Sequence, residues 1–460
     1  MESRKDVSTE TTITKGITLT IPIITANMDT VTEANMAIAI AREGGLGIIH
    51  RFMEIEREAA QVRRVKRAEA YIIEKPYSIS KDATIAEARD IMSRDAVSGL
   101  LVVDNANRLL GILSDRDIRF ITNEKEQVGR AMTPRSRLVV GTPGISMEGA
   151  LKILDKNRLE KLPIVDGGNV VHGLITSKDI YRQLHSETYA KDRKGRLLVG
   201  AAIGIKGDYI ERAQALAEAE VDMIVLDVAH GHTDSVIEAI KKVKKAVPHT
   251  SLVAGNVGTP EGVHDLVAAG ADCIKVGIGP GAACITRRVT GAGLPQLTAV
   301  MDCYEAAKKD HVEIIADGGI REPGDITKAL AAGASSVMIG SLFAGTEESP
   351  GYFVSRNGTK YKSYRGMASL GANISRKKLD RMNIRTETDI DVSWIVPEGV
   401  ESSVPYRGSV KEVVTQMVGG IRSGMSYCGA TSLAQLRKKA QFIRLTSNSA
   451  KESYDKLPQS

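Results

Sequence analysis

The sequence has little of what would indicate a secreted, metal-clustered or membrane protein. Its 460 residues include only four cysteines, and no two of them have the CxxC spacing of a zinc site or a disulfide framework. A reducing, cytoplasmic compartment fits this usage best. No apolar run approaches about 18 residues, and no N-terminal apolar stretch resembles a signal peptide, so neither a membrane span nor secretion is predicted.

The sequence also lacks a strong excess of charge of one sign. The formal net charge is +6 at pH 7, which is small for this length. Arginine and lysine are spread along the chain without interleaved aromatic residues, so nucleic acid is disfavoured as a partner and an anionic small molecule is a reasonable substrate. The length exceeds that of one ordinary domain, which predicts two domains.

What the sequence does contain is a repeated alternation of short apolar runs with segments of helical periodicity, the pattern of βα units. Eight parallel strands alternating with helices favour an α/β fold of the (β/α)8 TIM barrel type, although the pattern alone does not exclude an open sheet. The eight apolar runs span residues 21–27, 46–50, 199–204, 222–228, 251–256, 273–277, 312–317 and 336–340.

The gap between the second and third runs is too long for a crossover and contains an internal repeat. Asp104 corresponds to Asp166 and Ser114 to Thr176, an offset of 62 residues in both pairs. A constant offset without gaps indicates a duplicated unit. Each copy has a Ser or Thr three residues before an Asp, which taken alone is as readily a helix cap as a ligand contact. The predicted domains are therefore 1–70 with 185–460, and an insert at 71–184 with halves 71–130 and 131–184.

The segment from Ala271 to Val300 carries the clearest chemical signal. A short buried strand is followed by a glycine-rich loop, whose backbone can approach a ligand closely because no Cβ atoms intervene. Cys284 lies in this loop, near Arg287 and Arg288, where a thiolate is stabilised and can act as a nucleophile. A buried cysteine acting as a small hydrophobe is the common alternative. The glycines, which favour the nucleophile, are Gly277, Gly279, Gly281, Gly291 and Gly293.

Three segments together resemble the inosine monophosphate (IMP) dehydrogenase and guanosine monophosphate (GMP) reductase superfamily. Residues 277–287, GIGPGAACITR, resemble its active-site cysteine loop, residues 28–51 its first two βα units, and residues 315–326 its phosphate and ribose segment. The duplicated insert resembles a tandem CBS (Bateman) module, itself a feature of this family. The resemblance covers nearly the whole chain and implies a TIM barrel with an inserted tandem CBS domain.

The resemblance implies a role for each matching residue. Cys284 would add to C2 of the purine and Thr286 would take part in proton transfer. The charged segment at about 373–408 is either a solvated loop or a mobile lid, and as a lid it would bring Arg381 to activate water. Thr286 paired with Glu348 or Glu398 is the alternative carrier of that proton. Asp317 would bind both ribose hydroxyls, and Asp227 the ribose on the nicotinamide side of NAD. Further implied substrate contacts are Gly318, Gly319, Gly340, Ser341, Tyr364, Arg365, Gly366, Met367, Ala368 and Glu398, and further cofactor contacts are Gly277, Ile278 and Gly279.

The resemblance also implies a monovalent cation, potassium, and an assembly that is a homotetramer or octamer. Backbone carbonyls of Gly279, Gly281 and Cys284 would hold the cation, and Glu452 and Ser453 would complete the site in a neighbouring subunit. At the insert an adenine or guanine nucleotide would bind as an effector. Its implied contacts are Ser114, Asp117, Thr176 and Asp179.

Two activities of the family remain as alternatives: NAD-dependent oxidation of IMP to xanthosine monophosphate (XMP), and NADPH-dependent reduction of GMP to IMP. Residues 26–31 and 290–300 look more like the reductase, whereas 364–372, 396–401, 422–430 and 450–453 look more like the dehydrogenase, which we predict. Two departures concern the dehydrogenase pattern: Ala282 stands where serine is usual, and Met382 where a tyrosine usually follows the lid arginine. The chain also begins late, which suggests a truncated N-terminus. A catalytically dead, nucleotide-sensing protein is a third interpretation, against which Cys284 and Thr286 argue.

Overall fold

The computed structural model describes residues 4–68, 72–95, 97–184, 188–375 and 396–449. The chain divides into two compact units, Met1–Arg63 with Leu198–Ser460, and Arg64–Leu197. The predicted limits of the insert, 71 and 184, lie inside those of the second unit. Arg381, Glu452 and Ser453, to which the sequence assigns roles, lie outside the described residues.

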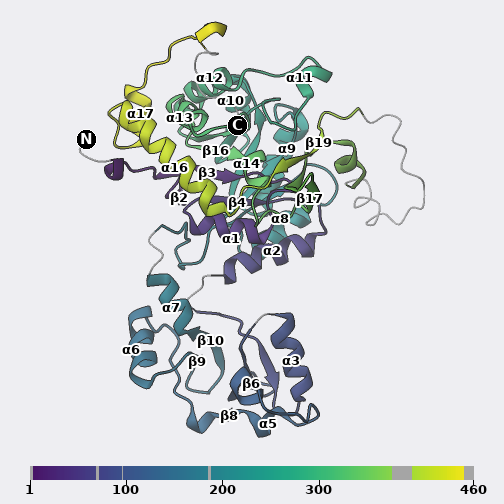
Figure 1. Cartoon of the computed structure of the whole chain (residues 1–460), viewed down its shortest axis with the longest axis vertical. Helices are drawn as coiled ribbons and strands as arrows, with labels where there is room; N and C mark the ends of the chain where they lie inside the picture. The colour runs from purple at the N-terminus through teal and green to yellow at the C-terminus, as the bar shows by residue number, and fades with distance from the viewer. Residues whose placement is uncertain (1–3, 69–71, 96, 185–187, 376–395, 450–460) are drawn as a thin grey trace. The chain divides into compact units, whose positions relative to one another are not determined.

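The first unit is built on a closed barrel of eight parallel strands, so the open-sheet alternative is excluded. Each predicted apolar run supplies one strand, because four or five consecutive apolar residues suit a strand that is buried on both faces. The helices lie around the strands (Figure 1). In spatial order the strands are β11 (Gly200–Ile203), β12 (Met223–Asp227), β13 (Ser251–Val257), β14 (Cys273–Val276), β15 (Glu313–Asp317), β16 (Ser336–Ile339), β3 (Ile23–Thr25) and β4 (Leu46–Ile49).

Amphipathic helices cover the barrel, and α9 (Asp234–Ala246) shows why they form. Its buried residues Val236, Ala239, Ile240 and Val243 follow the spacing of one helical face. At the start of α10 the Thr259 side chain accepts a hydrogen bond from the Gly262 N–H. The other main helices are α1 (Ala34–Arg42), α2 (Ile55–Arg67), α8 (Tyr209–Glu218), α10 (Pro260–Ala268), α12 (Gln296–Lys309), α13 (Pro323–Ala331), α16 (Val410–Tyr427) and α17 (Leu433–Lys439).

Short elements complete this unit. The antiparallel sheet β17–β18–β19 (Phe353–Arg356, Thr359–Arg365, Glu401–Pro405) pairs Arg365 with Glu401, which brings the turn after β18 beside residues 398–400. Strand β19 lies within the segment predicted as a lid at 373–408, of which 376–395 are outside the described residues. The remaining short elements are η1 (Arg4–Asp6), β1 (Thr11–Thr14), β2 (Ile17–Leu19), α11 (Thr286–Val289) and α14 (Ser341–Ala344).

The second unit shows the duplication as two similar halves. Leu109 N–H donates to the Asn169 carbonyl and Val171 N–H to the Asn107 carbonyl, both at 2.9 Å. These two bonds are related by the repeat offset, so the halves meet through equivalent residues. The first half contains β5 (Ser78–Ser80), α3 (Ile85–Arg94), β6 (Gly99–Val103), β7 (Leu109–Ser114), α4 (Asp115–Ile118), α5 (Val128–Ala131), β8 (Thr133–Pro134) and η2 (Arg135–Arg137). The second contains α6 (Met147–Asn157), β9 (Lys161–Val165), β10 (Val171–Thr176) and α7 (Ser177–Leu184).

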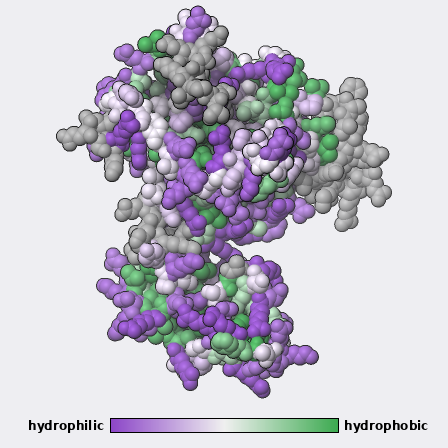
Figure 2. Space-filling model, in the orientation of Figure 1, coloured by the Kyte–Doolittle hydropathy of each residue, from purple (hydrophilic) through white to green (hydrophobic). Residues whose placement is uncertain are grey.

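Each unit keeps large apolar side chains inside. Leu101 and Leu109 of the first half of the insert share one buried cluster with Val165 and Leu174 of the second. On the face shown in Figure 2, hydrophilic residues prevail and hydrophobic patches are scattered. In the described chain, no helix combines the length and apolar character that a membrane crossing requires.

Candidate active site

A cavity of about 410 Å³ is lined by residues at and beyond the C-terminal ends of the barrel strands. This volume lies in the range that accommodates small-molecule ligands, and this end of a TIM barrel is where active sites form. The loop after β14 supplies Cys284, and the turn after β18 supplies Gly366 to Ala368. Segments far apart in the chain therefore converge on one site.

Cys284 is connected to a carboxylate through one hydroxyl group. Its thiol donates to Oγ1 of Thr286 at 3.2 Å, and the Thr286 hydroxyl donates to Oε2 of Glu398 at 2.7 Å. All three residues line the cavity. A proton can move along such a chain from the thiol toward the carboxylate, leaving a nucleophilic thiolate.

Backbone hydrogen bonds fix the two segments that carry this chain. Ile285 N–H donates to the Glu398 carbonyl at 2.8 Å, and Val400 N–H donates to the Ala283 carbonyl at 3.0 Å. Cys284 N–H closes its own loop by donating to Gly281 at 3.0 Å. These main-chain bonds hold the backbone of residue 398 beside the loop that carries Cys284.

Gly277 shows why the loop after β14 needs glycine. Its φ is +147°, and a Cβ atom there would lie 2.3 Å from the Asp317 carbonyl oxygen. Any other residue would push apart the ends of β14 and β15, which hold the two sides of the cavity.

Two carboxylates of the cavity share one buried ammonium group. Lys275 Nζ lies 2.6 Å from Oδ1 of Asp227 and 2.6 Å from Oδ2 of Asp317. Asn27 donates to the other oxygen of Asp227 at 2.9 Å, and Asn256 donates to Oδ2 of Asp317 at 2.9 Å. Lys275 and an asparagine side chain therefore fix the position of each carboxylate.

The directions of the pKa shifts of Asp227 and Lys275 favour the ionised form of each group. Burial alone would raise the pKa of Asp227, but Lys275 and Asn27 outweigh it and hold the pKa below its usual value. Burial would lower the pKa of Lys275, but Asp227 and Asp317 raise it instead. Burial, with the nearby Asp317 and Cys284, raises the pKa of Tyr364 to about 12, so its hydroxyl stays a neutral donor.

The cavity lining includes most of the described residues that the sequence assigned to catalysis, substrate, cofactor or cation, and four of those assigned to the substrate are not part of it. Gly319, Gly340, Ser341 and Arg365 do not line the cavity, although a Cβ atom at Gly340 would lie 3.3 Å from the Tyr364 hydroxyl. The predicted residues that line the cavity are Asp227, Gly277, Ile278, Gly279, Gly281, Cys284, Thr286, Asp317, Gly318, Tyr364, Gly366, Met367, Ala368 and Glu398.

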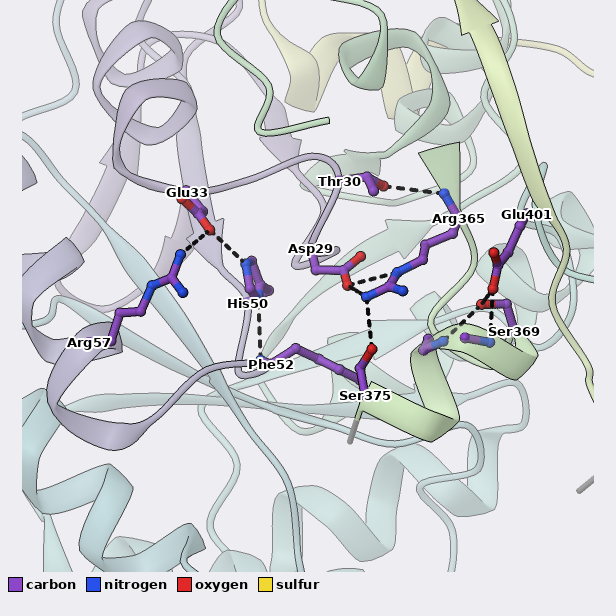
Figure 3. Close-up of polar contacts among 12 residues, drawn as sticks. Asp29, Thr30, Glu33, His50, Phe52, Arg57, Arg365, Ser369, Ser375 and Glu401 are labelled. Atoms are coloured by element: carbon purple, nitrogen blue, oxygen red, sulfur yellow. Dashed lines mark hydrogen bonds and ion pairs between the residues drawn. The ribbon is translucent and has the colours of Figure 1, made fainter. Parts of the chain in front are cut away.

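Arg365 is directed toward Asp29 (Figure 3). Its Nε lies 2.9 Å from Oδ2 of Asp29, and its Nη2 also contacts that oxygen. Its backbone N–H donates to Thr30 Oγ1 at 3.3 Å, and its Nη2 reaches Ser375 Oγ at 3.5 Å. The sequence assigned Arg365 to substrate binding, and the structure gives it a bracing position, because it ties the end of β18 to the loop after β3.

A second polar group in Figure 3 supports the loop after β4, which brings Arg51 and Phe52 to the cavity. His50 Nε2 lies 3.3 Å from Oε1 of Glu33, and His50 Nδ1 accepts the Phe52 N–H at 3.1 Å. Because Nδ1 accepts a hydrogen bond, Nε2 is the ring nitrogen that donates toward Glu33.

In the second unit, the predicted effector residues pair with one another. The Ser114 hydroxyl and its N–H both donate to Oδ2 of Asp117 at 2.7 Å, which is the geometry of a helix cap. Thr176 and Asp179 form the matching pair, with the Asp179 N–H donating to Thr176 Oγ1 at 3.2 Å. The capping role that the sequence left open is therefore present in both halves.

Sequence reasoning missed five polar residues of the site. Four of them, Asn27, Arg51, Asn256 and Asn373, line the cavity, and Lys275 lies behind it. A signal existed for Lys275, because a lysine in the middle of the apolar run CIKVG requires a buried counter-charge. No sequence pattern distinguishes the asparagines, and only the folded barrel identifies them.

Comparison with known proteins agrees with this geometry. The family model described as "IMP dehydrogenase / GMP reductase domain" matches residues 2–455. The inosine-5'-monophosphate dehydrogenase of Nitrosopumilus maritimus is 49% identical over 444 residues, which is 96% of this chain and 92% of that protein. That of Bacillus subtilis is 47% identical over 452 residues, 98% of this chain and 91% of the relative.

Solved structures give a second kind of comparison. A cysteine-to-alanine variant of GMP reductase from Trypanosoma brucei, in complex with guanosine 5'-monophosphate, is similar with a TM-score of 0.93 and 42% identity, covering 100% of this chain and 95% of that chain. The same enzyme in complex with guanosine 5'-triphosphate has a TM-score of 0.82 and 38% identity, over 97% and 94% of the two chains. The match along nearly the whole length shows that the chain belongs to the IMP dehydrogenase / GMP reductase family.

Proposed function

We propose that the protein is an IMP dehydrogenase, which oxidises IMP to XMP with NAD through a covalent bond between Cys284 and C2 of the purine. The observation that carries the proposal is the chain of hydrogen bonds from Cys284 through Thr286 to Glu398 at the cavity. The dehydrogenases that share 47–49% identity with nearly the whole chain support this choice.

The first half-reaction begins at the thiol. Its proton moves to the Thr286 hydroxyl as the Thr286 proton moves to Glu398, and the thiolate adds to C2 of IMP. NAD bound on the Asp227 side supplies the acceptor for the hydride that leaves C2. The purine then remains attached to Cys284, oxidised by two electrons.

The second half-reaction releases the product. Once Glu398 has passed the first proton to solvent, water adds to C2, its proton is taken up along the path from Thr286 to the Glu398 carboxylate, and the bond from C2 to sulfur breaks to give XMP and the thiolate. Arg381 of the lid segment is the alternative base. A guanidinium with a pKa above about 12 serves only when it is desolvated and oriented, so we favour the carboxylate route.

The cavity residues suit the proposed ligands. One oxygen of Asp317 receives Lys275 and Asn256, and the other is available for ribose hydroxyls. Gly319, Gly340 and Ser341, which do not line the cavity, are proposed to bind the 5′-phosphate through backbone N–H groups, and Gly318, which does line it, is proposed to contact the substrate. Tyr364, Gly366, Met367, Ala368 and Glu398 are proposed to surround the base.

The cofactor and the cation are also proposals. Asp227 and the backbone of Gly277, Ile278 and Gly279 line the cavity and fit the nicotinamide side of NAD. Within the described part of the chain, the carbonyl oxygens of Gly279 and Cys284 accept no hydrogen bond, so they suit a monovalent cation such as potassium. Glu452 and Ser453 of a neighbouring subunit would complete that site in a homotetramer or octamer.

For the second unit we propose a tandem CBS module at about 71–184 that binds an adenine or guanine nucleotide as an effector. The duplicated pairs Ser114 with Asp117 and Thr176 with Asp179 support this assignment by their equivalent geometry. The hydroxyl and carboxyl groups that now cap helices would turn to the ribose of the effector.

GMP reductase is the second candidate. Two observations favour it: the solved reductase structures are similar over nearly the full length, and Met382 stands where the dehydrogenase pattern has a tyrosine. This enzyme would use NADPH and expel ammonia from the same covalent adduct.

The absorbance at 340 nm distinguishes the two candidates. With IMP and NAD the proposal predicts a rise in absorbance, and with GMP and NADPH no fall above the background of a Cys284→Ala control. A fall with GMP and NADPH, without a rise in the first mixture, would identify the reductase and overturn our first choice.

A further inference from the structure

Lys275 is buried in a strand that otherwise consists of apolar residues. It is 1% exposed, and its neighbours in β14 are buried cysteine, isoleucine and valine. A buried ammonium requires partners for its three N–H groups. It has three: Oδ1 of Asp227, Oδ2 of Asp317 and Oδ1 of Asn256.

These four residues lie on four adjacent strands. Asp227 ends β12, Asn256 is on β13, Lys275 on β14, and Asp317 ends β15, and the barrel order places these strands side by side. Asn256 adds a second link, because its Nδ2 donates both to Asp317 and to the Gly277 carbonyl, at 2.9 and 2.8 Å. The cluster is therefore a continuous polar layer beneath the cavity.

The two carboxylates belong to different proposed half-sites. Asp317 is assigned to the mononucleotide and Asp227 to the dinucleotide, yet each has an oxygen 2.6 Å from the same nitrogen. Those two oxygens are consequently no more than 5.2 Å apart. Without the ammonium, two like charges at this distance would oppose each other's ionisation.

We propose that Lys275 is a positioning residue that couples the two half-sites, by holding the mononucleotide carboxylate Asp317 and the dinucleotide carboxylate Asp227 together as ionised hydrogen-bond acceptors. This inference rests on the proposed function and deepens it. Lys275 itself does not line the cavity, so it acts on both ligands through the carboxylates. The raised pKa of Lys275, which the two carboxylates cause against the effect of burial, agrees with a permanent charge.

The test measures IMP affinity by calorimetry, without NAD, so that turnover is not needed. In Lys275→Met the carboxylates face each other unscreened, and IMP affinity should fall at least about tenfold. The charge-matched variant Lys275→Met with Asp227→Asn should recover most of that affinity, although Asp227 belongs to the other half-site. A double variant that binds IMP no better than Lys275→Met would overturn the coupling, because a purely structural lysine predicts no such rescue.

The chain supplies a matched control in Lys362, a second lysine that is 1% exposed. Its ammonium is held by backbone carbonyls, including those of Thr346 at 2.9 Å and Ser349 at 2.6 Å, and it does not line the cavity. Lys362→Met should lower the unfolding temperature and leave IMP affinity within about threefold. An equal loss of IMP affinity in this control would assign the Lys275 effect to general destabilisation.

A second comparison applies where Lys275→Met alone does not fold. The double variant should then bind IMP within about threefold of the single variant Asp227→Asn. The reason is that no like charge then lies beside Asp317, so the ammonium adds little to the stability of its ionised form. Binding at least about tenfold weaker would contradict the proposal. Wild-type protein that binds GMP and not IMP would contradict the proposed dehydrogenase activity. Because IMP and GMP carry the same ribose, the same comparison of Lys275 variants, made with GMP, would still test whether Lys275 couples the two half-sites.

Discussion

Replacement of Glu398 by glutamine should separate the two halves of the proposed reaction, because the Cys284 thiol can pass its proton to solvent before IMP binds, whereas water must lose a proton within the closed site as it adds to C2. The Thr286 hydroxyl lies 2.7 Å from Oε2 of Glu398, and an amide at that position still accepts a hydrogen bond but no longer takes up the proton. Removal of a general base typically slows a step by about 10² to 10⁴-fold. The main-chain bonds of residue 398 to Ile285 and Ala368 do not involve the side chain, so the loop should keep its structure.

Stopped-flow measurement of NADH with IMP and NAD is the assay. Glu398→Gln should give a burst of about one NADH per site, followed by a steady state at least about 100-fold slower than that of the wild type. Glu401→Gln is the matched control, because Glu401 lies on the same segment, accepts hydrogen bonds from Ser369 and Gly371, and does not line the cavity. It should produce no burst.

Two results would refute this reasoning. A Glu398→Gln steady state within about threefold of the wild type would remove the carboxylate from the hydrolytic step. A burst in Arg381→Ala, combined with normal behaviour of Glu398→Gln, would transfer the role of base to the lid arginine.

Three further predictions follow from the contacts. Arg365→Met removes the guanidinium that contacts the Asp29 carboxylate and should lower the free energy of unfolding by about 1–3 kcal/mol, measured by urea denaturation; an unchanged midpoint would show that the pair contributes nothing. The pKa of Asp227 is lowered in the fold, so the ionised carboxylate contributes stability above its usual pKa, and this contribution is lost as pH falls below about 4. In thermal unfolding at pH 3 to 5, the unfolding temperature of Asp227→Asn should therefore fall less with decreasing pH than that of the wild type. An identical dependence of unfolding temperature on pH would exclude Asp227 as the source of the loss. Removal of residues 71–184 should leave the IMP and NAD reaction within a few-fold and abolish its response to added adenine or guanine nucleotides, and a soluble but inactive product would make the insert structural.

The barrel could be predicted from the sequence because each of its strands is a short apolar run that burial on both faces requires. The run at 312–317 ends in Asp317 and the run at 222–228 has Asp227 as its second-last residue, and a polar residue at the end of a buried strand indicates the active end of a barrel. The glycines around Cys284 indicated its loop for a similar local reason.

The remaining features depend on contacts between distant residues. Arg365 was assigned to substrate because of its place in a motif, whereas its partner Asp29 is 336 residues away and is brought near only by the fold. The sharing of Lys275 by Asp227 and Asp317 follows from strand order, which the sequence does not state. The pairs in the insert could be read equally as caps or as ligand contacts, because both uses require the same hydroxyl and carboxyl groups.

The central claim is that Cys284 forms a covalent bond to the purine during turnover, and intact-protein mass spectrometry after an acid quench tests it most directly. With IMP and NAD, the Glu398→Gln protein should accumulate a species whose mass exceeds that of the free protein by the mass of IMP minus one hydride and one proton. Fragmentation should locate this added mass on Cys284. The same mixture with a Cys284→Ser protein should show only the unmodified mass. Turnover of IMP to XMP with no adduct in either the wild type or Glu398→Gln, or an adduct on another residue, would contradict the account.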